Sequence, residues 1–408
     1  MRRERRADVC RLRGASSRGL GRRSRGEDQL QVRADEDKPL ILLAAGGTGG
    51  HLFPAFALAE ELARRGYAVD LVTDERGDRY GTGFPARTVY QIPSATLSGR
   101  SPMAVVRTAS KLSRGVVRAY RLLGKIKPAV VVGFGGYPTF PPLIAAGWRR
   151  IPTVIHEQNA VLGRANRMLA KRVSIIATSF DAVRGLDGGL AAKARFTGNP
   201  VRAQVAALAD RPFKAPSPGE PFHLVVFGGS QGARYFSDTV PQALLRLSEE
   251  ERVRLRVVQQ AREEDVARVE AAYRSAGIAA MIAPFFKDLP ERLADAHLIV
   301  ARAGASTTAE LTVIGRPSLL VPLPHSLDND QLYNATRLAE SGGCWCIEQK
   351  DLGPERLAAE IGMAMARPER LEAAAISAKK QGRPDAVARL ADEVGELGNV
   401  QHKPGRTN

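Results

Sequence analysis

Cysteine is scarce in this sequence, which holds only Cys10, Cys344 and Cys346 among 408 residues. Three cysteines cannot build the disulfide framework of a secreted domain, so their number is typical of a protein of the reducing cytosol. Cys344 and Cys346 could supply two ligands to zinc, but a closed zinc site takes about four and nothing nearby in the sequence supplies the others. We therefore predict that this pair lies on a strand and that the chain holds no metal.

Long apolar runs are absent as well. A membrane-spanning helix needs ~20 consecutive apolar residues, and the stretch Pro39–Ala45 is only long enough for a short buried strand. The basic N-terminal segment also has no apolar core of the kind that a secretory signal requires. We therefore expect neither a membrane span nor a secretory signal.

Acidic residues are nearly missing from the start of a chain whose net charge is +17. Residues 1–26 carry ten arginines against Glu4 and Asp8. High charge with low hydrophobicity predicts a disordered tail over residues 1–36. Two explanations of this tail stay open, a dispensable arm and a start codon assigned too far upstream.

A second acid-free stretch runs from Arg79 to His156, without a single Asp or Glu. Between Arg107 and Lys127 its basic residues alternate with apolar ones. A helix of this composition can lay an apolar stripe on a membrane while its cations meet anionic lipid headgroups. An ordinary core helix with a solvated basic face fits the same pattern. Nucleic acid fits less well, because aromatic stacking platforms are nearly absent and no binding motif occurs.

The order of the strand and loop signals repeats along the chain. Leu40–Ala45 runs into a glycine-rich turn, and so does Phe222–Phe227. Two further strand-like runs in the first half, at residues 129–136 and 151–155, have counterparts at residues 297–304 and 316–321. Strands that alternate with helical patterns indicate parallel α/β architecture. We predict two tandem Rossmann-like, doubly wound domains that face each other across a cleft.

A cluster of prolines marks the boundary between the halves, at positions 200, 212, 216, 218 and 221. The predicted organisation is a tail over residues 1–36, a first domain over 37–200, a linker over 201–220, a second domain over 221–375, a C-terminal helix over 376–396 that returns to the first domain, and a tail over 397–408.

The glycine-rich turns favour phosphate, because they expose backbone N–H groups beside the start of a helix. Neither turn has the lysine of a Walker loop. The dinucleotide fingerprint also fails, at Leu52 in the first turn and at Ser230 in the second. Asp74 lies where a ribose-binding acid would stand, so a Rossmann oxidoreductase stays open as a minor alternative.

The segment Gly304–Glu310 is the most specific of these loops. Backbone amides of Ala305 to Thr308 could hold a diphosphate, and Glu310 could accept hydrogen bonds from ribose hydroxyls. A capped helix with a solvated Glu310 is the plain alternative. Asp328 and Asp330 form an Asp-x-Asp pair that could hold a divalent metal on a diphosphate, but a helix terminus can stabilise that group alone, and we favour the metal-free interpretation.

Two histidines follow predicted strands, at positions 51 and 156. Transfer of a sugar to a hydroxyl needs a base with a pKa near neutrality, which histidine supplies. Glu157 could serve if its pKa were raised. A core or capping role is the alternative for either histidine.

Taken together, these segments resemble the MurG family of glycosyltransferases, which has the GT-B fold. The matching pieces are Gly46–Pro54 (GGTGGHLFP), Gly133–Pro138 (GFGGYP), His156–Asn159 (HEQN), Gly198–Arg202 (GNPVR), Gly228–Ala233 (GGSQGA), Arg302–Glu310 (RAGASTTAE), and the pair Gln331 and Asn334. They occur in the family's order over residues 39–394.

The resemblance implies an inverting transfer of N-acetylglucosamine from UDP-N-acetylglucosamine to the 4-hydroxyl of undecaprenyl-pyrophosphoryl-MurNAc-pentapeptide, in peptidoglycan synthesis and without a cofactor. His51 would be the base and Glu157 the second candidate. The donor would be bound by Ser230, Phe286, Ala305, Ser306, Thr307, Thr308, Ala309, Glu310 and Gln331, and also by Thr48, Gly49, Gly50, Asn159 and Arg202. The family's peripheral place on the cytoplasmic face of the cell membrane implies that the basic stretch docks on anionic lipid.

Two other functions stay open at this point. A GT-B transferase could act on another lipid or on a small metabolite, because only the resemblance identifies the acceptor. A basic protein without catalysis, bound to membrane or nucleic acid, would explain the charge but not the paired glycine loops.

Overall fold

A computed structural model describes residues 38–46, 49–74, 83–94 and 102–401. The predicted tail over residues 1–36 lies outside the described residues, as does Thr48. Within the described ranges no helix combines the length and the apolar composition that a bilayer span requires.

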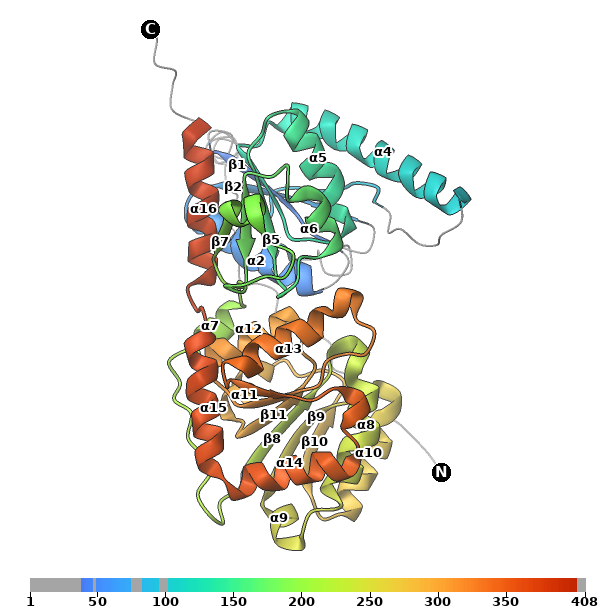
Figure 1. The fold of residues 1–408 in the computed structure, drawn as a ribbon, viewed down its shortest axis with the longest axis vertical. Helices are drawn as coiled ribbons and strands as arrows, with labels where there is room; N and C mark the ends of the chain where they lie inside the picture. Colours follow the sequence, from blue (N-terminus) through green and yellow to red (C-terminus); the bar gives the residue numbers. More distant parts are fainter. Residues whose placement is uncertain (1–37, 47–48, 75–82, 95–101, 402–408) are drawn as a thin grey trace, which may run out of the picture. The chain divides into compact units, whose positions relative to one another are not determined.

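The first half contains a sheet of seven parallel strands (Figure 1). The strands are β1 (Leu40–Ala44), β2 (Ala68–Thr73), β3 (Val89–Gln91), β4 (Val130–Gly133), β5 (Thr153–Glu157), β6 (Ile175–Thr178) and β7 (Ala194–Phe196). They lie in the order β3-β2-β1-β4-β5-β6-β7. The central strands β1, β2, β4 and β5 are buried along their whole length, as their continuous apolar runs predict for a sheet covered on both faces.

The second half contains a parallel sheet of six strands. These are β8 (Phe222–Phe227), β9 (Leu255–Gln260), β10 (Ala279–Ala283), β11 (Leu298–Ala301), β12 (Ser318–Leu320) and β13 (Cys344–Cys346). Their order, β10-β9-β8-β11-β12-β13, repeats the order of the first six strands of the other sheet. The prediction of two doubly wound domains is therefore confirmed. Cys344 and Cys346 lie on the last strand at the sheet edge, as predicted.

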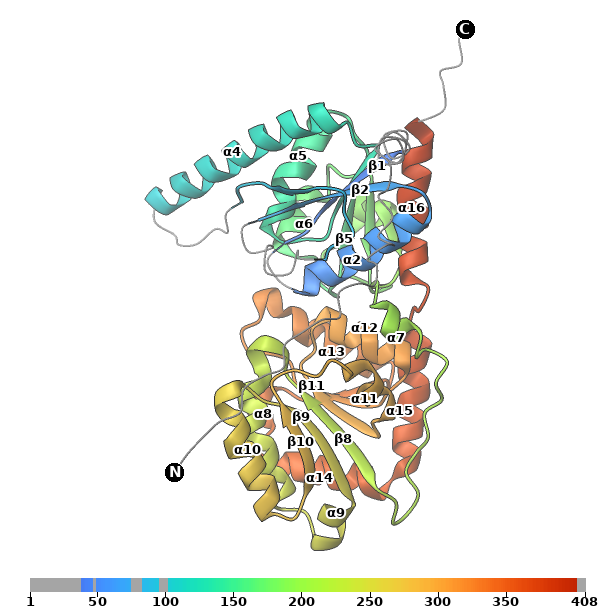
Figure 2. The same cartoon turned by 180° about the vertical axis from the view of Figure 1, so that it is seen from behind.

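Helices cover both sheets (Figures 1 and 2). In the first half they are α2 (Gly49–Arg64), α4 (Pro102–Ile126), α5 (Phe140–Trp148) and α6 (Arg164–Leu169), with η1 (Tyr137–Thr139) and η2 (Gly188–Lys193). In the second half they are α8 (Gly229–Leu244), α9 (Glu249–Arg254), α10 (Glu263–Ser275), α11 (Leu289–Asp295), α12 (Ala305–Ile314), α13 (Asp330–Glu340) and α14 (Pro354–Ala366), with η3 (Leu327–Asn329) and η4 (Gln349–Asp351).

Helix α4 is packed in the core along one stripe, and membrane docking of its exposed face stays a prediction. One stripe, which includes Val116, Ala119 and Leu123, is buried in the first-half core. On the other side Val117 is 50% exposed and Tyr120 is 39% exposed, among basic residues. The helix packs on α5 and extends beyond it in both views (Figures 1 and 2). It is therefore a core helix that also presents an amphipathic outer face.

The expected linker packs on the second half. Val205 of the short helix α7 (Ala203–Ala206) lies in a cluster with residues of β8, β11 and α12. Arg316 is 1% exposed and its guanidinium donates to the carbonyls of Arg211 and Pro212, at 3.2 and 3.3 Å. A buried guanidinium needs its donors satisfied, so these carbonyls hold the linker against the second sheet.

The C-terminal segment consists of two helices where one was expected over residues 376–396. They are α15 (Pro368–Gln381) and α16 (Ala386–Gln401). Pro384 lies between them, and proline interrupts a helix because it lacks an N–H donor and clashes with the preceding turn. Helix α15 packs on α12 of the second half, whereas α16 packs on α2 of the first.

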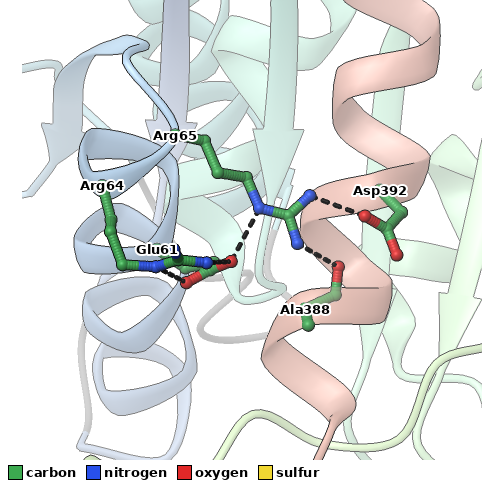
Figure 3. Close-up of polar contacts among 5 residues, drawn as sticks. All are labelled: Glu61, Arg64, Arg65, Ala388 and Asp392. Carbon is green, nitrogen blue, oxygen red and sulfur yellow. Dashed lines mark hydrogen bonds and ion pairs between the residues drawn. The ribbon is translucent and has the colours of Figure 1, made fainter.

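Polar contacts join α16 to α2 (Figure 3). Arg65, in the turn directly after α2, donates to Glu61 of that helix at 2.6 Å, and to Asp392 and the Ala388 carbonyl of α16 at 2.6 and 3.1 Å. Arg64 binds the same Glu61 carboxylate. Beneath this exposed network Leu390 is fully buried in the first-half core. The last helix is therefore part of that core.

We predict that Leu390→Ala lowers the free energy of unfolding by about 2–5 kcal/mol, because it leaves a cavity in a packed core. Urea unfolding measures this loss. Ile376→Ala on α15 is the matched control, since Ile376 is 51% exposed and its truncation should cost less than about 0.5 kcal/mol. Equal losses for the two variants would contradict the placement of α16 in the core.

Candidate functional site

The strand order reverses at the centre of each sheet, between β1 and β4 and between β8 and β11. Such a reversal opens a crevice at the carboxyl ends of parallel strands, where ligands of this fold class bind. All the glycine-rich loops singled out in the sequence follow those ends. The candidate site is built at these two positions.

His51 lies in the first turn of α2 and is half-buried. Its Nδ1 is 3.3 Å from Oε1 of Gln158. Burial lowers the pKa of His51, while hydrogen bonds with Gln158 and the Phe134 backbone and the charge of Asp330 oppose that shift. The imidazole is therefore neutral at neutral pH, which is the form that accepts a proton.

Glycine occupies two positions of the loop after β4 that lie near this ring. Gly135 and Gly136 have positive φ angles, 85° and 74°, a conformation that residues with a Cβ atom avoid. A Cβ on Gly135 would lie 3.3 Å from Cε1 of His51, a tight contact, and one on Gly136 would lie 3.5 Å from its Cδ2, an ordinary van der Waals distance. The backbone conformation of the loop therefore favours glycine, and the space beside it is taken by the imidazole.

Glu157 ends strand β5 and is 2% exposed. Its Oε1 accepts from the Asn159 amide at 3.0 Å, and its Oε2 accepts from the Gly163 amide and the Asn166 side chain at 2.9 and 2.8 Å. Burial raises the pKa of Glu157, and these hydrogen bonds oppose the rise. Both carboxyl oxygens therefore shape the loop after β5.

Asn159 lies beside the second half through Asn334 of α13. Asn334 donates to Oδ1 of Asn159 at 3.0 Å and to the Ala303 carbonyl at 3.1 Å, and its own Oδ1 accepts from the Ala160 amide at 2.8 Å. Asn334 is fully buried. It connects the loop after β5 with the loop after β11.

Gln331, one turn earlier on α13, connects two loops of the second half. Its Oε1 accepts from the amides of Ala303 and Leu323, at 3.2 and 3.0 Å. The loops after β11 and β12 therefore orient the side chain of Gln331, which we predict to bind the donor.

Helix α12 begins at the predicted diphosphate segment. Its N-cap is Gly304, and no described side chain caps its first turn. Oγ of Ser306 is buried without a hydrogen-bond partner among the described residues. Thr308 differs, since its hydroxyl donates to the carbonyls of Gly304 and Ala305 at 3.3 and 3.0 Å. The helix start thus offers amides and one hydroxyl to an anion.

Arg202 and Glu310 form a bidentate ion pair, with Nε and Nη2 at 2.9 and 3.0 Å from the two carboxyl oxygens. The Glu310 side chain is 10% exposed and the Arg202 side chain 33%. Burial raises the pKa of Glu310, and the charge and hydrogen bonds of Arg202 oppose the rise. The structure therefore brings two predicted donor-binding residues into direct contact.

The Asp-x-Asp pair has other partners. Asp328 accepts from Arg164 at 3.2 Å, and Asp330 accepts from the Gln331 amide at 2.7 Å. Asp328 and Asn329 both have a φ of 55°, which Asn and Asp tolerate better than most residues. Among the described residues no group of three His, Cys, Asp or Glu side chains could hold a metal ion.

The remaining predicted residues lie at the same ends of the sheets. Gly49 and Gly50 form the first turn of α2 beside His51. Phe286 follows β10 and is 9% exposed, with the Arg292 guanidinium 5.0 Å from its ring centroid. Ser230 lies in the first turn of α8, and its side chain is not among those described.

A cavity of about 290 Å³ lies next to part of this site. Ala305, Thr308 and Ala309 of α12 line it, together with Asn199. Asn199 is 4% exposed, and neither polar atom of its side chain has a partner among the described residues. A polar cavity of this size can hold ordered water. His51 and Gln331 do not line it.

Sequence reasoning missed two polar residues of the site, Gln158 and Asn334. Both belong to motifs quoted from the sequence, and Asn334 was named there with Gln331, but neither was predicted to be a site residue. Their partners Phe134 and Ala303 are distant in sequence, 24 and 31 residues away. Only their place at the end of a strand and the start of a helix could have indicated them.

Two family models match most of the chain. Residues 41–178 match the glycosyltransferase family 28 N-terminal domain, and residues 223–390 match the glycosyltransferase family 28 C-terminal domain. Among solved structures, a crystal structure of Acinetobacter baumannii MurG is similar with a TM-score of 0.73 and 27% identity, over 88% of this chain and 99% of that one. A Staphylococcus aureus MnaA–UDP structure, 13% identical with a TM-score of 0.63 over 91% and 100% of the two chains, shares the fold.

Curated relatives are closer in sequence. A UDP-N-acetylglucosamine–N-acetylmuramyl-(pentapeptide) pyrophosphoryl-undecaprenol N-acetylglucosamine transferase of Methylobacterium sp. (strain 4-46) is 57% identical over 88% of this chain and 97% of its own length. Proteins of the same name from Sinorhizobium fredii and Rhodopseudomonas palustris are each 53% identical, over 88% and 89% of this chain and 95% and 100% of their own.

We predict that Arg202→Met destabilises the protein by about 1–3 kcal/mol at neutral pH, because Glu310 is left buried without its cation. The pKa of Glu310 in the folded state, already raised by burial, should rise further, while the unfolded value stays near ~4.3. The folded state then binds a proton that the unfolded state has released, so the loss should grow as pH rises between these two pKa values.

Urea unfolding at pH 5 and pH 8 checks this dependence. Arg246→Met is the control, because its pair with Glu355 is exposed, with 43% and 73% of the two side chains accessible, and such pairs contribute about 0–1 kcal/mol. The double variant Arg202→Met, Glu310→Gln should be more stable at pH 8 than the single variant Arg202→Met. A loss that is independent of pH would contradict the assignment to Glu310.

Proposed function

The chain belongs to glycosyltransferase family 28, in its MurG group, and from this premise we propose which of its residues carry out the reaction. The enzyme has the GT-B fold and moves N-acetylglucosamine from UDP-N-acetylglucosamine to the 4-hydroxyl of lipid-linked MurNAc-pentapeptide, with inversion at the anomeric carbon. The product is the lipid-linked disaccharide precursor of peptidoglycan.

The start of α12 would bind the diphosphate of the donor. Its uncapped amides and the buried Ser306 hydroxyl, which has no partner among the described residues, are the groups that satisfy phosphate oxygens. Ala305, Thr307, Thr308 and Ala309 complete this turn. As the bond to the sugar breaks, negative charge grows on the diphosphate, and the helix dipole stabilises it. No metal or cofactor is needed in this proposal.

Glu310 would accept hydrogen bonds from the ribose hydroxyls. The bidentate contact with Arg202 supports this role, because it orients the buried carboxyl group and opposes the rise in its pKa that burial causes. Arg202 would contact the donor from the same side. Phe286 would lie against the base and Gln331 beside the sugar, while Ser230, Thr48, Gly49, Gly50 and Asn159 would complete the donor contacts.

His51 would be the general base. The observation that carries this assignment is a neutral imidazole at the carboxyl end of β1, against the glycine loop after β4. Glu157 is the weaker candidate, since both its oxygens accept hydrogen bonds from the loop that follows. The proton of the acceptor hydroxyl would pass to His51 as the oxygen attacks the anomeric carbon and UDP leaves.

The outer face of α4 would dock on the anionic surface of the cytoplasmic leaflet. Val117, Tyr120 and, at the end of α5, Trp148 are 50%, 39% and 66% exposed. The Arg149 guanidinium lies 3.9 Å from the Tyr120 ring centroid, so cation and aromatics share one surface. Basic residues with exposed apolar ones suit a membrane interface. Nucleic acid is not proposed as a partner.

We predict that His51→Ala lowers kcat by about 10²–10⁴-fold, the usual contribution of a general base, with little change in the Kd of UDP-N-acetylglucosamine. Turnover with a short-chain lipid acceptor, read by mass, and calorimetric titration of the donor measure the two quantities. His223→Ala is the control, because His223 is exposed at the opposite end of β8. Undiminished turnover would place the base elsewhere.

We also predict that Val117→Ser, Tyr120→Ser and Trp148→Ser together weaken binding to phosphatidylglycerol vesicles at least about tenfold, because each buried apolar side chain contributes to partitioning. Cosedimentation at low and high salt measures this binding. Val253→Ser is the control, since Val253 is 63% exposed on α9 of the second half. If the triple variant bound vesicles as tightly as the control, this surface would not be the docking face.

A further inference from the structure

Gln158 lies between two imidazoles and touches both. Its Oε1 is 3.3 Å from Nδ1 of His51, and its Nε2 is 3.1 Å from Nδ1 of His156. The chain of contacts continues from Nε2 of His156 to the Gly198 carbonyl, at 3.0 Å. Gly198 follows β7, where the backbone leaves the first sheet. A buried line of hydrogen bonds therefore leads from that carbonyl to the proposed base.

The surroundings of the amide fix which of its two ends faces His51. Nε2 also donates to the Phe134 carbonyl at 2.9 Å and lies 3.1 Å from the His156 carbonyl. Rotating the amide by 180° would place its oxygen against these two oxygens, with no proton between them. Gln158 is 2% exposed, so water cannot relieve that repulsion. The oxygen of Gln158 must face His51.

His156 is held in one protonation state from its other side. Only a protonated Nε2 can donate to the Gly198 carbonyl, which leaves Nδ1 with the lone pair that accepts from Gln158. The residue is completely buried, and burial lowers the pKa of His156 to about 4, with a smaller contribution from His51. His156 therefore stays neutral near neutral pH, and the direction of the hydrogen-bond line does not change there.

We propose that Gln158 is a positioning residue that selects the tautomer of His51, with the proton on Nδ1 and the basic lone pair on Nε2. An amide oxygen can only accept, so Nδ1 of His51 must donate to it. Turning the ring over would move Nδ1 away from Gln158 and break this hydrogen bond. This inference rests on the proposed role of His51 and adds the residue that directs it.

The chemical step is balanced in this arrangement. The acceptor hydroxyl loses its proton to Nε2 of His51, its oxygen forms the bond to the anomeric carbon, and the bond from that carbon to the diphosphate breaks with its electron pair leaving on UDP. The imidazolium that forms keeps its Nδ1–H bond to Gln158. Asp330 also favours the charged ring, while His156 beside it stays neutral. The neutral oxygen of Gln158 thus stabilises the imidazolium of His51 as it forms, but leaves the ring neutral before the reaction.

Nuclear magnetic resonance of protein labelled with ¹⁵N-histidine tests the proposal directly. Wild-type enzyme should show the His51 proton on Nδ1 at neutral pH, with His51→Ala used to assign the signal. Gln158→Leu should give a mixture of tautomers, or Nε2–H, and should lower kcat on the order of 10²-fold while the Kd of UDP-N-acetylglucosamine stays unchanged. Gln242→Leu, on the exposed side of α8, is the matched control.

A second variant covers the case in which Gln158→Leu does not fold. Gln158→Met keeps the length of the side chain and removes the acceptor that faces Nδ1 of His51, so it should also give a mixture of tautomers or Nε2–H, with a similar loss of kcat. A wild-type His51 with its proton on Nε2, or an unchanged Nδ1–H tautomer in Gln158→Met, would overturn the inference.

The proposed tautomer of His51 and its proposed role as the base can be disproved independently of each other. If His51→Ala keeps its turnover, His51 is not the base, yet the resonance spectra still report whether Gln158 selects its tautomer. If His51→Ala is inactive but Gln158→Leu retains both full turnover and the Nδ1–H tautomer, the base assignment stands and the role of Gln158 is excluded.

Discussion

Hydrogen bonds from side chains to backbone groups at the carboxyl ends of the strands hold the loops of the site in place. The carboxyl ends of parallel strands lie at one edge of the sheet. The chain turns there, and the N–H and C=O groups of the turns lie outside the hydrogen bonds of the sheet. Glu157, Gln158, Gln331 and Asn334 satisfy those groups with side-chain hydrogen bonds between loops that are far apart in sequence. The loops keep their shape because these amides and this carboxylate are fully engaged. His51 and Ser306, to which we assign roles in the proposed reaction, lie next to these loops.

The halves are similar in topology, but the site uses them differently. In the first half the residues at the switch point surround one imidazole with backbone and an uncharged amide. In the second half the corresponding position presents a helix start and the Glu310 carboxyl group paired with Arg202. The same strand order therefore carries an imidazole and an amide at one switch point, and an uncapped helix start and an ion pair at the other.

The sequence predicted what depends on neighbouring residues. An apolar run followed by glycines is a local pattern, so both sheets and the loops at their ends could be located, and the strand at Cys344–Cys346 as well. Contacts between distant residues escaped, because Gln158 and Asn334 gain their meaning from Phe134 and Ala303. Helix α4 showed why composition left two alternatives, since one helix has both a buried stripe and an exposed basic face. Pro384 indicates a helix break in the sequence, but we predicted one continuous helix across it.

The position of α16 has a consequence for biosynthesis. Leu390, Ala391 and Val394 belong to the core of the first half although the ribosome adds them only after the sheet of the second half. The N-terminal sheet therefore emerges, and waits through the synthesis of the entire second half, with one of its faces incompletely covered. Domains tend to fold in the order in which they leave the ribosome, but here the second half can finish first. A chain that stops before α16 would expose the apolar surface that Leu390, Ala391 and Val394 cover, the kind of surface that makes incomplete chains prone to aggregate.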